Sequence, residues 1–440
     1  MAEKSGRKKD GRLMKRIMGI TVVLSLVVSG LLITTLFADE PKLHLAPVNP
    51  EFKEYMEKVG TGELPRVRAG AGDEYPLGLI PSPLDMSHTK GLSVISVSQP
   101  EPPSTYDLRG QGRLTSVKDQ GGCGSCWTFA TYGSLESWIR GEEDVIWDFS
   151  ENNLKECHGF DWTACEGGNQ LMSTAYLTRW SGPIIETDDS YDENETACTS
   201  GLMVRKHVET VLMAPDRDGS SENDDNIKQA IMDYGAMYTT MYINNEYFVG
   251  GELYYNYDGP DTIGNHAVTI VGWDDGMSKD LFEASSDGAW IIKNSYGTVF
   301  GDEGCFYISY DDISIGKDNA SFINAVEPAS TIYQYDPLGV VTSVGVESSN
   351  TMWGANIFTA TDDECLTSVG FYALAVNTSY YIYIYDTFSG SSFSELLGSK
   401  SGTLSYPGYH TVDLANPVCL ADGGDFAVAI EFTTPGNEFP

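Results

Sequence analysis

The amino-acid sequence predicts an α+β fold followed by an all-β sandwich, and three observations carry this prediction. Helical and strand patterns mix between about residues 102 and 328, whereas from 329 to 440 helical periodicity is absent and short alternating apolar segments recur. The 46 glycines and 25 tyrosines favour turns and β-structure over long helices. The 440 residues exceed one ordinary domain. We therefore expect folded domains at 102–328 and 329–440, preceded by a separate segment at 39–101.

The first 38 residues, 1–38, carry a targeting signal. A cluster of basic residues opens it: Lys4, Arg7, Lys8, Lys9, Arg12, Lys15 and Arg16. No charged residue follows from Ile17 to Ala38, and at about 1.5 Å per helical residue this stretch is long enough to cross a bilayer. The pattern fits a cleaved signal peptide or an uncleaved anchor with a transmembrane helix at about 17–38. Either one places the body of the protein outside the cell, where disulfides persist.

The stretch from Asp39 to Glu101 is Pro-rich and irregular. Its one helix candidate lies near Phe52–Val59, and nothing in its pattern predicts a compact core. The run Pro100-Glu101-Pro102-Pro103 marks the end of the stretch as a linker.

Two helices and four strands are predicted between 102 and 328. The helices are Cys126–Arg140 and Asn226–Tyr234, and the strands are Ala236–Ile243, His266–Trp273, Ala289–Lys293 and Cys305–Tyr310. Acidic loops separate them, including 188–195 and 216–225. The second loop lacks the ligand spacing of an EF-hand. We therefore interpret this second loop as solvated, and we predict no metal site.

The C-terminal part contains the segments expected to form the sandwich. They are Thr331–Tyr335, Ala355–Thr359, Leu366–Ala373, Tyr380–Tyr385, His410–Leu414 and Asp425–Phe432. Tyr381, Tyr383 and Tyr385 alternate along one of them, which places three rings on one face of a strand. That face either forms the core of the sandwich or stacks on sugars or proteins.

The formal net charge of −36 restricts the partners of this chain. Such a negative surface repels the phosphate backbone, so we expect no nucleic-acid partner. It suits a soluble protein on a crowded exterior, although generic solubility explains it equally well.

The strongest local motif is Asp119-Gln-Gly-Gly-Cys-Gly-Ser-Cys-Trp127. It places Cys126 at the start of a helix, where free N–H groups and the helix dipole favour an anion and lower the pKa of a thiol. The preceding glycines let backbone and substrate approach closely. Alternatively, either cysteine of the motif forms half of a disulfide, or Cys-x-x-Cys forms a redox or metal site.

The motif resembles the active-site segment of the papain and cathepsin family of cysteine peptidases. Gln120 and Cys126-Trp127 match this segment, and Asn265-His266-Ala267-Val268 and Lys293-Asn294-Ser295-Tyr296-Gly297 match the histidine and asparagine segments downstream. The resemblance covers about 102–328. It implies a two-lobed papain-like fold, with a helical lobe and a β-barrel-like lobe, and it requires no cofactor.

The resemblance also assigns a role to each residue. The Cys126 thiolate attacks the peptide carbonyl, His266 transfers protons, and Asn294 orients the histidine in the Cys-His-Asn version of a catalytic triad. The Gln120 side-chain amide and the Cys126 backbone N–H bind the oxyanion. The sequence departs from the family at Tyr296 and at Phe300, where tryptophans are usual.

Further expectations follow from the same likeness. Cys123 should pair with Cys165, and Cys157 with Cys198. Gly167 and Gly168 should hydrogen-bond an extended substrate. Residues 39–101 become a propeptide, with a plain linker as the alternative.

The remaining cysteines and the C-terminal region also receive an interpretation. Cys365 and Cys419 could pair with each other, and Cys305 should be a buried free thiol. The C-terminal region is similar to the lectin-like domain behind some microbial papain-type peptidases. It would bind a glycan or protein of the cell surface, while the peptidase takes protein or peptide substrates. A cell-surface adhesin with an inactive papain-like scaffold and a transpeptidase using the same thiol remain alternatives.

Overall fold

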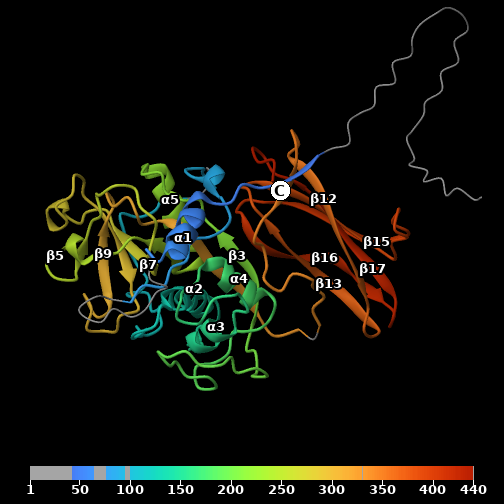
Figure 1. Cartoon of the computed structure of the whole chain (residues 1–440), viewed down its shortest axis with the longest axis horizontal. Coiled ribbons are helices and arrows are strands. Elements are labelled where there is room, and N and C mark those ends of the chain that lie inside the picture. The colour runs from blue at the N-terminus through green and yellow to red at the C-terminus, as the bar shows by residue number, and fades with distance from the viewer. Residues whose placement is uncertain (1–41, 64–75, 95–99, 330, 440) are drawn as a thin grey trace, which may run out of the picture. The chain divides into compact units, whose positions relative to one another are not determined.

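We describe the protein from a computed structural model, which places residues 42–63, 76–94, 100–329 and 331–439 (Figure 1). The charge-free stretch at 17–38, expected to be a signal peptide or anchor, lies outside the described residues. Within the described parts, no helix combines the length and the hydrophobicity needed to span a membrane.

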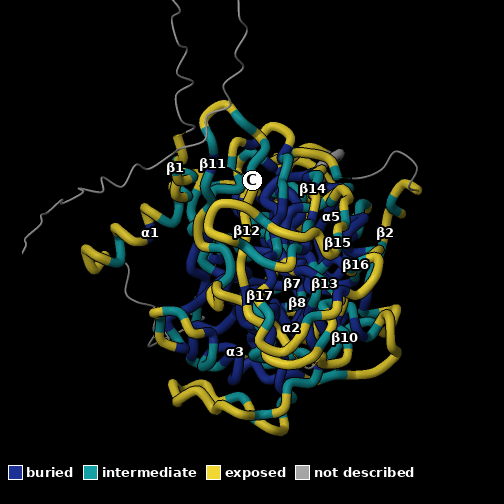
Figure 2. Tube along the Cα trace, turned by 90° about the vertical axis from the view of Figure 1, so that its right-hand side faces the viewer, coloured by how far each residue is buried: buried dark blue, intermediate teal, exposed yellow. Residues whose placement is uncertain are grey.

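Five α-helices occur in the described residues. They are α1 Pro50–Thr61, α2 Cys126–Glu143, α3 Glu151–Cys157, α4 Gln170–Thr178 and α5 Ser221–Tyr234. Helix α2 is the central helix, because α3 and α4 pack against it together with strands of the main sheet. Polar caps begin the shorter helices: the Asn169 side chain accepts hydrogen bonds from the backbone of Leu171 and Met172 at the start of α4. Figure 2 shows α2 buried and most of α1 exposed.

The main sheet has the strand order β13-β16-β3-β10-β4-β7-β8-β9-β6-β5, and β2 pairs with β7 beside this path. Its strands are β2 Thr105–Asp107, β3 His207–Met213, β4 Met237–Met241, β5 Phe248–Val249, β6 Tyr254–Tyr255, β7 His266–Asp274, β8 Ala289–Lys293, β9 Cys305–Ser309, β10 Lys317–Val326, β13 Glu364–Ala373 and β16 Gly408–Leu420. Strands β4, β7, β8 and β9 form an antiparallel run that carries the histidine and asparagine segments on neighbouring strands.

The C-terminal part is a β-sandwich with a second sheet of order β12-β17-β14-β15. These strands are β12 Thr351–Thr359, β14 Thr378–Tyr385, β15 Leu396–Leu404 and β17 Asp425–Thr433. Its core includes Val369, Ile382, Val412 and Ile430, which come from both sheets. Cys365 and Cys419 face each other on β13 and β16 and form a disulfide.

The sandwich is joined to the preceding domain by backbone hydrogen bonds. Gly408, Tyr409 and His410 of β16 pair with β3, so the main sheet runs through both parts of the chain. Sequence patterns predicted a sandwich, but they gave no sign of this pairing, because β3 and β16 are far apart along the chain.

Several predicted elements agree with the structure to within a few residues, and others were missed. The prediction of a strand at Thr331–Tyr335 was wrong, because no strand is assigned there. Sequence patterns missed α3, α4, β3, β10 and β15. Helices α3 and α4 are short and almost entirely buried, so they lack the amphipathic pattern that reveals a surface helix.

The segment before the first domain is more ordered than its sequence suggested. Strand β1, Leu43–Leu45, pairs with β11, Val344–Val346, and helix α1 spans the predicted helix candidate. Leu79, Ile80 and Leu84 are buried, and Leu79 and Leu84 belong to core clusters formed with later parts of the chain. These residues pack onto the rest of the protein rather than onto one another.

Candidate active site

Cys126 is the first residue of α2 and a free thiol with no exposed surface. The turn before it is held by the Cys123–Cys165 disulfide, the pairing that the family resemblance implies. Cys157 and Cys198 are also joined, as implied. The sulfur of Cys126 accepts a hydrogen bond from the Ala267 backbone N–H at 3.4 Å. Because Cys123 is committed to Cys165, the Cys-x-x-Cys motif is not a redox pair in this structure.

His266 and Asn294 come together because they lie on adjacent antiparallel strands. His266 begins β7, and Asn294 directly follows β8. The Nε2 atom of His266 lies 2.8 Å from Oδ1 of Asn294. The Tyr296 ring stacks on the imidazole at 4.8 Å between centroids, and its hydroxyl lies 3.3 Å from Nδ1. Tyr296 therefore covers the imidazole and adds a polar contact to it.

Gln120 is held in place by groups from both sides of the cleft. Its side-chain Oε1 accepts a hydrogen bond from the Ser295 hydroxyl at 2.6 Å, and its backbone N–H donates to the Ser295 carbonyl at 2.9 Å. Its Nε2 donates to the carbonyl of Cys123 at 2.9 Å and to that of Pro76 at 3.1 Å. The amide thus already binds a carbonyl oxygen next to Cys126.

The Pro76 carbonyl belongs to an N-terminal strap, residues 76–80, which crosses the site. The Gly168 N–H donates to the carbonyl of Gly78 at 3.0 Å, and the Ile80 N–H donates to the carbonyl of Gly168 at 3.0 Å. On the other side, the Leu79 N–H donates to the Asn265 carbonyl at 3.4 Å. The hydrogen-bonding groups of Gly168 that were expected to hold a substrate are therefore occupied by the chain itself.

Glycines make this close approach feasible. A Cβ atom at Gly168 would lie 2.4 Å from the Trp127 ring, and one at Gly167 would lie 2.7 Å from the Gly78 carbonyl oxygen. Gly167 also has a φ of +125°, which other residues rarely adopt. Larger residues at these positions would push the strap or the ring away.

Burial shifts the pKa values of Cys126 and His266 in opposite directions. Burial raises the pKa of Cys126 to about 12, against the opposing effect of backbone N–H groups of Ala267 and Gly78. Burial likewise lowers the pKa of His266 to about 4, and the hydrogen bond to Asn294 opposes this shift. In this state the thiol and the imidazole are both neutral near pH 7.

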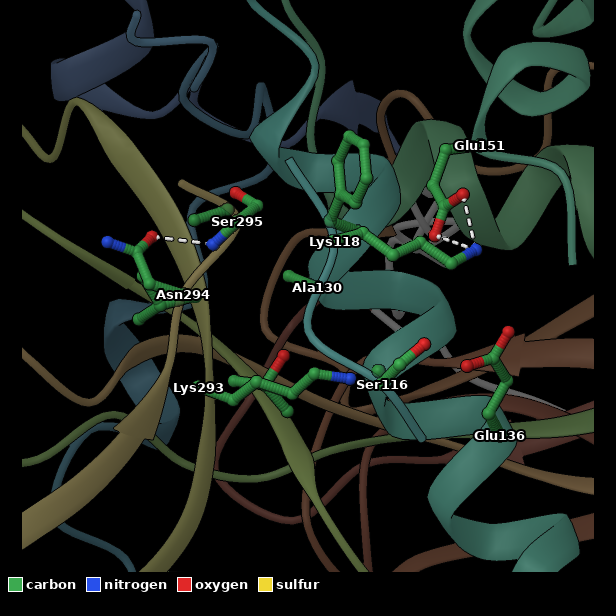
Figure 3. Close-up of a pocket in the computed structure, with 13 residues that line it drawn as sticks. Ser116, Lys118, Ala130, Glu136, Glu151, Lys293, Asn294 and Ser295 are labelled. Atoms are coloured by element: carbon green, nitrogen blue, oxygen red, sulfur yellow. Dashed lines mark hydrogen bonds and ion pairs between the residues drawn. The ribbon is translucent and has the colours of Figure 1, made fainter. Parts of the chain in front are cut away.

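Behind Asn294 lies a buried charge network that sequence patterns did not reveal (Figure 3). The Lys118 ammonium contacts both carboxylate oxygens of Glu151, at 2.8 and 2.9 Å. Burial raises the pKa of Glu151 to about 8, while the charge of Lys118 opposes the shift. Glu136 accepts from the Thr115 hydroxyl at 2.5 Å, and the Lys293 ammonium lies 3.3 Å from that hydroxyl. Glutamates on helices are usually exposed. Only the tertiary packing therefore reveals that Glu136 and Glu151 are buried.

The charge network surrounds a small cavity of about 20 Å³ between the helices and the strands. Glu136 and Glu151 come from α2 and α3, whereas Lys293 comes from β8. A cavity of this size holds about one water molecule. The network therefore lies between helices α2 and α3 and strand β8, which precedes Asn294.

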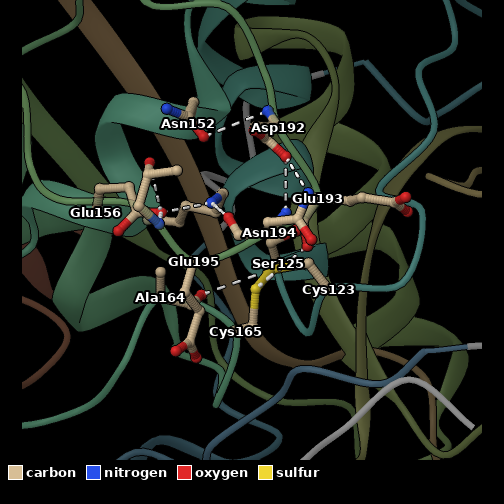
Figure 4. Close-up of polar contacts among 12 residues, drawn as sticks. Cys123, Ser125, Asn152, Glu156, Ala164, Cys165, Asp192, Glu193, Asn194 and Glu195 are labelled. Carbon is tan, nitrogen blue, oxygen red and sulfur yellow. Dashed lines mark hydrogen bonds and ion pairs between the residues drawn. A yellow bond between two sulfur atoms is a disulfide. The ribbon is translucent and has the colours of Figure 1, made fainter.

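The acidic loop at 188–195 contacts the turn that precedes Cys126 (Figure 4). The Tyr191 hydroxyl donates to the Gln120 carbonyl at 2.7 Å and lies 2.6 Å from the Ser125 hydroxyl. A carboxylate oxygen of Glu193 accepts from the Gly122 N–H at 2.7 Å. The side chains of this loop therefore help to fix the turn before Cys126, a role that the sequence pattern did not indicate.

Comparisons with known proteins agree with this geometry. Residues 102–323 match the family model of papain family cysteine proteases, and residues 332–440 match that of a lectin-like domain. A viral cathepsin of the Spodoptera exigua nuclear polyhedrosis virus is 28% identical over 264 residues, which cover 58% of this chain and 70% of that protein. Cysteine proteinase 3 of Entamoeba histolytica is 30% identical over 224 residues, covering 49% of this chain and 67% of that protein.

Among solved structures, the cysteine protease and lectin-like domains of Cwp84 are similar over both parts of the chain. Cwp84 is a surface layer associated protein of Clostridium difficile. The match has a TM-score of 0.75 and 27% identity, and it covers 90% of this chain and 86% of that one. A variant of the clostridial cysteine protease Cwp84 after propeptide cleavage matches with a TM-score of 0.67 and 29% identity, covering 77% of this chain and 86% of that one.

Proposed function

The chain belongs to the papain family of cysteine proteases, and from this premise we propose that it is the proenzyme of an extracellular peptidase with Cys126, His266 and Asn294 as its catalytic residues. The observation that carries the proposal is the 2.8 Å contact between His266 and Asn294 beside a free cysteine at a helix N-terminus. Protein and peptide chains are its substrates. Residues 102–328 form the peptidase domain, and 329–440 form a lectin-like domain.

The catalytic cycle begins once the strap has left the cleft. Without the strap, the thiol and the imidazole regain solvent, and the proton of Cys126 passes to His266. The thiolate attacks the peptide carbonyl, and the oxyanion accepts hydrogen bonds from Gln120 Nε2 and the Cys126 N–H. His266 then donates its proton to the leaving amine, which departs and leaves a thioester. Water activated by His266 hydrolyses the thioester and releases the thiol.

The position of the strap supports the oxyanion and substrate assignments. The Pro76 carbonyl accepts from Gln120 Nε2, which is the contact that a substrate oxyanion would make. Gly168 offers both its N–H and its carbonyl to the strap, as it would to an extended substrate. We therefore assign residues 39–101 as a propeptide, because substrate and strap compete for the same hydrogen bonds.

An extracellular location is supported by three features. The basic cluster followed by the charge-free stretch at 17–38 fits a signal peptide or anchor. Three disulfides are stable in an oxidising compartment. The similar protein Cwp84 is itself surface-layer associated. The lectin-like domain would then hold the peptidase near its targets.

The decisive test is hydrolysis by the activated protein and by its Cys126→Ala variant, with product analysis in the presence and absence of an amine acceptor. We expect the activated protein to release free carboxyl termini and the variant to release none. Equal turnover by the two would contradict the proposal. Dominant transfer to the acceptor would replace hydrolysis with transpeptidation on the same thiol.

A further inference from the structure

The outer face of the four-stranded sheet carries aromatic rings where a sandwich usually carries polar side chains. Along β14, Ile382 and Ile384 have no exposed surface and point into the core. Tyr381, Tyr383 and Tyr385 alternate with them and therefore point outward. Tyr381 is 49% exposed. Of the two interpretations that the sequence left open for these tyrosines, the structure contradicts the core and places them on the surface.

The rings continue across neighbouring parts of the sheet. Trp353 of β12 is 51% exposed and stacks on Tyr383, with 5.3 Å between centroids and 18° between planes. Tyr383 and Tyr385 are 6.2 Å apart at 19°, and Tyr385 and Phe393 are 4.7 Å apart at 16°. We call Trp353, Tyr383, Tyr385 and Phe393 the aromatic row. Its small interplanar angles and short centroid distances show that neighbouring rings are stacked on one another.

The alanines of the central strand show how the rings lie. Ala429 and Ala427 of β17 pair directly with Tyr383 and Tyr385, so they point to the same outer side. Their exposed fractions are nonetheless 1% and 0%. Neighbouring rings that lean over such small side chains account for this burial. The aromatic row therefore lies across the sheet.

Hydroxyl groups border the aromatic row on one side. On the edge strand β15, Ser399, Ser401 and Thr403 pair with Tyr383, Tyr381 and Ser379, and all three are exposed. They share the outer face with the tyrosines because directly paired residues point to the same side.

The charges of this face are few and negative. Glu431 pairs with both Trp353 and Tyr381, and Asp425 occupies another outward position of β17. By register, the outward strand positions of the described sheet include no lysine or arginine. Anionic lipids and anionic polymers are therefore poor ligands for this surface.

We propose that the aromatic row binds an extended, uncharged polysaccharide. The C–H faces of pyranose rings pack on the exposed rings of this face, of which Trp353 is 51% and Tyr381 is 49% exposed. The sugar hydroxyls bond to the serine and threonine border and to Glu431. Rings with an apolar face and a polar edge suit such a ligand. This inference deepens the targeting role given to the lectin-like domain under the proposed function.

The test is co-sedimentation of the full-length protein with amorphous cellulose, colloidal chitin and mannan. We expect at least one of the three to bind. Trp353→Ala and Tyr383→Ala should each weaken that binding about tenfold, as losing one stacking ring does in other stacked ligand sites. Trp353→Phe keeps a ring and should retain most of the binding. Tyr335→Ala removes a ring that is 60% exposed outside the aromatic row, and it is the matched control.

Two measurements keep the outcomes distinct. Hydrolysis of a small peptide after activation reports whether each variant is folded, and its absence in the activated wild-type protein would contradict the peptidase assignment rather than this one. Sedimentation with vesicles of phosphatidylcholine and phosphatidylglycerol tests the membrane alternative. Failure of all three polysaccharides to bind, or wild-type binding by Trp353→Ala, would overturn the proposal. Vesicle binding that depends on Trp353 would overturn it as well.

Discussion

The active-site cleft and the aromatic row belong to the same chain but differ in their exposure to solvent. The cleft brings together Cys126, His266 and Asn294 from distant segments, and a strap from the same chain covers it. The aromatic row is built from nearby strands of one sheet and is open to solvent, with Trp353 half exposed. The comparison teaches that the residues of the proposed catalytic site are covered in this structure, whereas the surface that we propose for binding is open to solvent.

The largest expected effect separates the two regions completely. Replacing Cys126 with alanine should lower kcat/KM for a small peptide by roughly 10³-fold or more, because the nucleophile is lost. Polysaccharide binding by the aromatic row should not change. The control is Cys305→Ala, which removes the other free, buried cysteine. If Cys126→Ala and Cys305→Ala were equally active, the cleft would not be the catalytic site.

Within the cleft, His266 and Asn294 should differ in how much each contributes to kcat/KM. His266→Ala removes the group that transfers the proton, so we expect a loss close to that of Cys126→Ala. Asn294→Ala removes only the group that orients the imidazole through the 2.8 Å contact. We expect it to lower kcat/KM by roughly 10- to 100-fold. Steady-state kinetics on the activated protein measure both, and a larger loss for Asn294→Ala would reverse the assigned roles.

Weakening the docking of the strap should expose the active site to solvent, as the aromatic row already is. Leu79 is 4% exposed and packs with Trp127, Tyr238 and Ala267. Leu79→Ala should destabilise docking of the strap by about 2–5 kcal/mol, the usual cost of such a truncation. The uncleaved proenzyme should then hydrolyse a small peptide measurably faster. Met56→Ala, on the exposed side of α1, is the control. Unchanged latency in Leu79→Ala would show that the strap does not inhibit.

The smallest expected effect is a pH dependence of the docking of helix α1, which precedes the strap. Lys317 lies 3.6 Å from Glu51 of α1, and Asp216 and Asp318 lie close by. Burial, with the charge of Asp318, raises the pKa of Asp216 to about 7, and burial, with the charge of Glu51, raises that of Asp318 to about 6. Asp261 also contacts Lys317, at 3.3 Å.

Both pKa values are raised above the ordinary value of about 4. Docking of α1 is therefore most favourable below about pH 4, and it weakens as pH rises through about 7. Latency of the uncleaved proenzyme should fall between pH 5 and pH 8 by a few-fold. Glu51→Gln should flatten this dependence, whereas Glu54→Gln, which affects only an exposed pair with Lys58, should not. Latency that rises with pH would contradict the assignment.

The sequence by itself determined the family of this protein. The motif around Cys126 and the segments around His266 and Asn294 have residue types and neighbours that few other arrangements share. A free cysteine at a helix start and a histidine at a strand start are local features, so a linear pattern can reveal them. The helix at α2 and the strands β7 and β8 were predicted for the same reason.

Tertiary structure alone decided what covers the site and which faces meet solvent. The segment with Leu79 has the pattern of an irregular linker, because its hydrogen bonds go to Gly168 and Asn265 rather than to its own neighbours. Strand β14 alternates two apolar residue types, tyrosine and isoleucine, so its pattern defines two faces without saying which one is buried. Glu136 and Glu151 look solvated on their helices, yet they are buried between the two sides of the cleft. Each outcome depends on contacts between distant segments, and a linear sequence does not specify which segments meet.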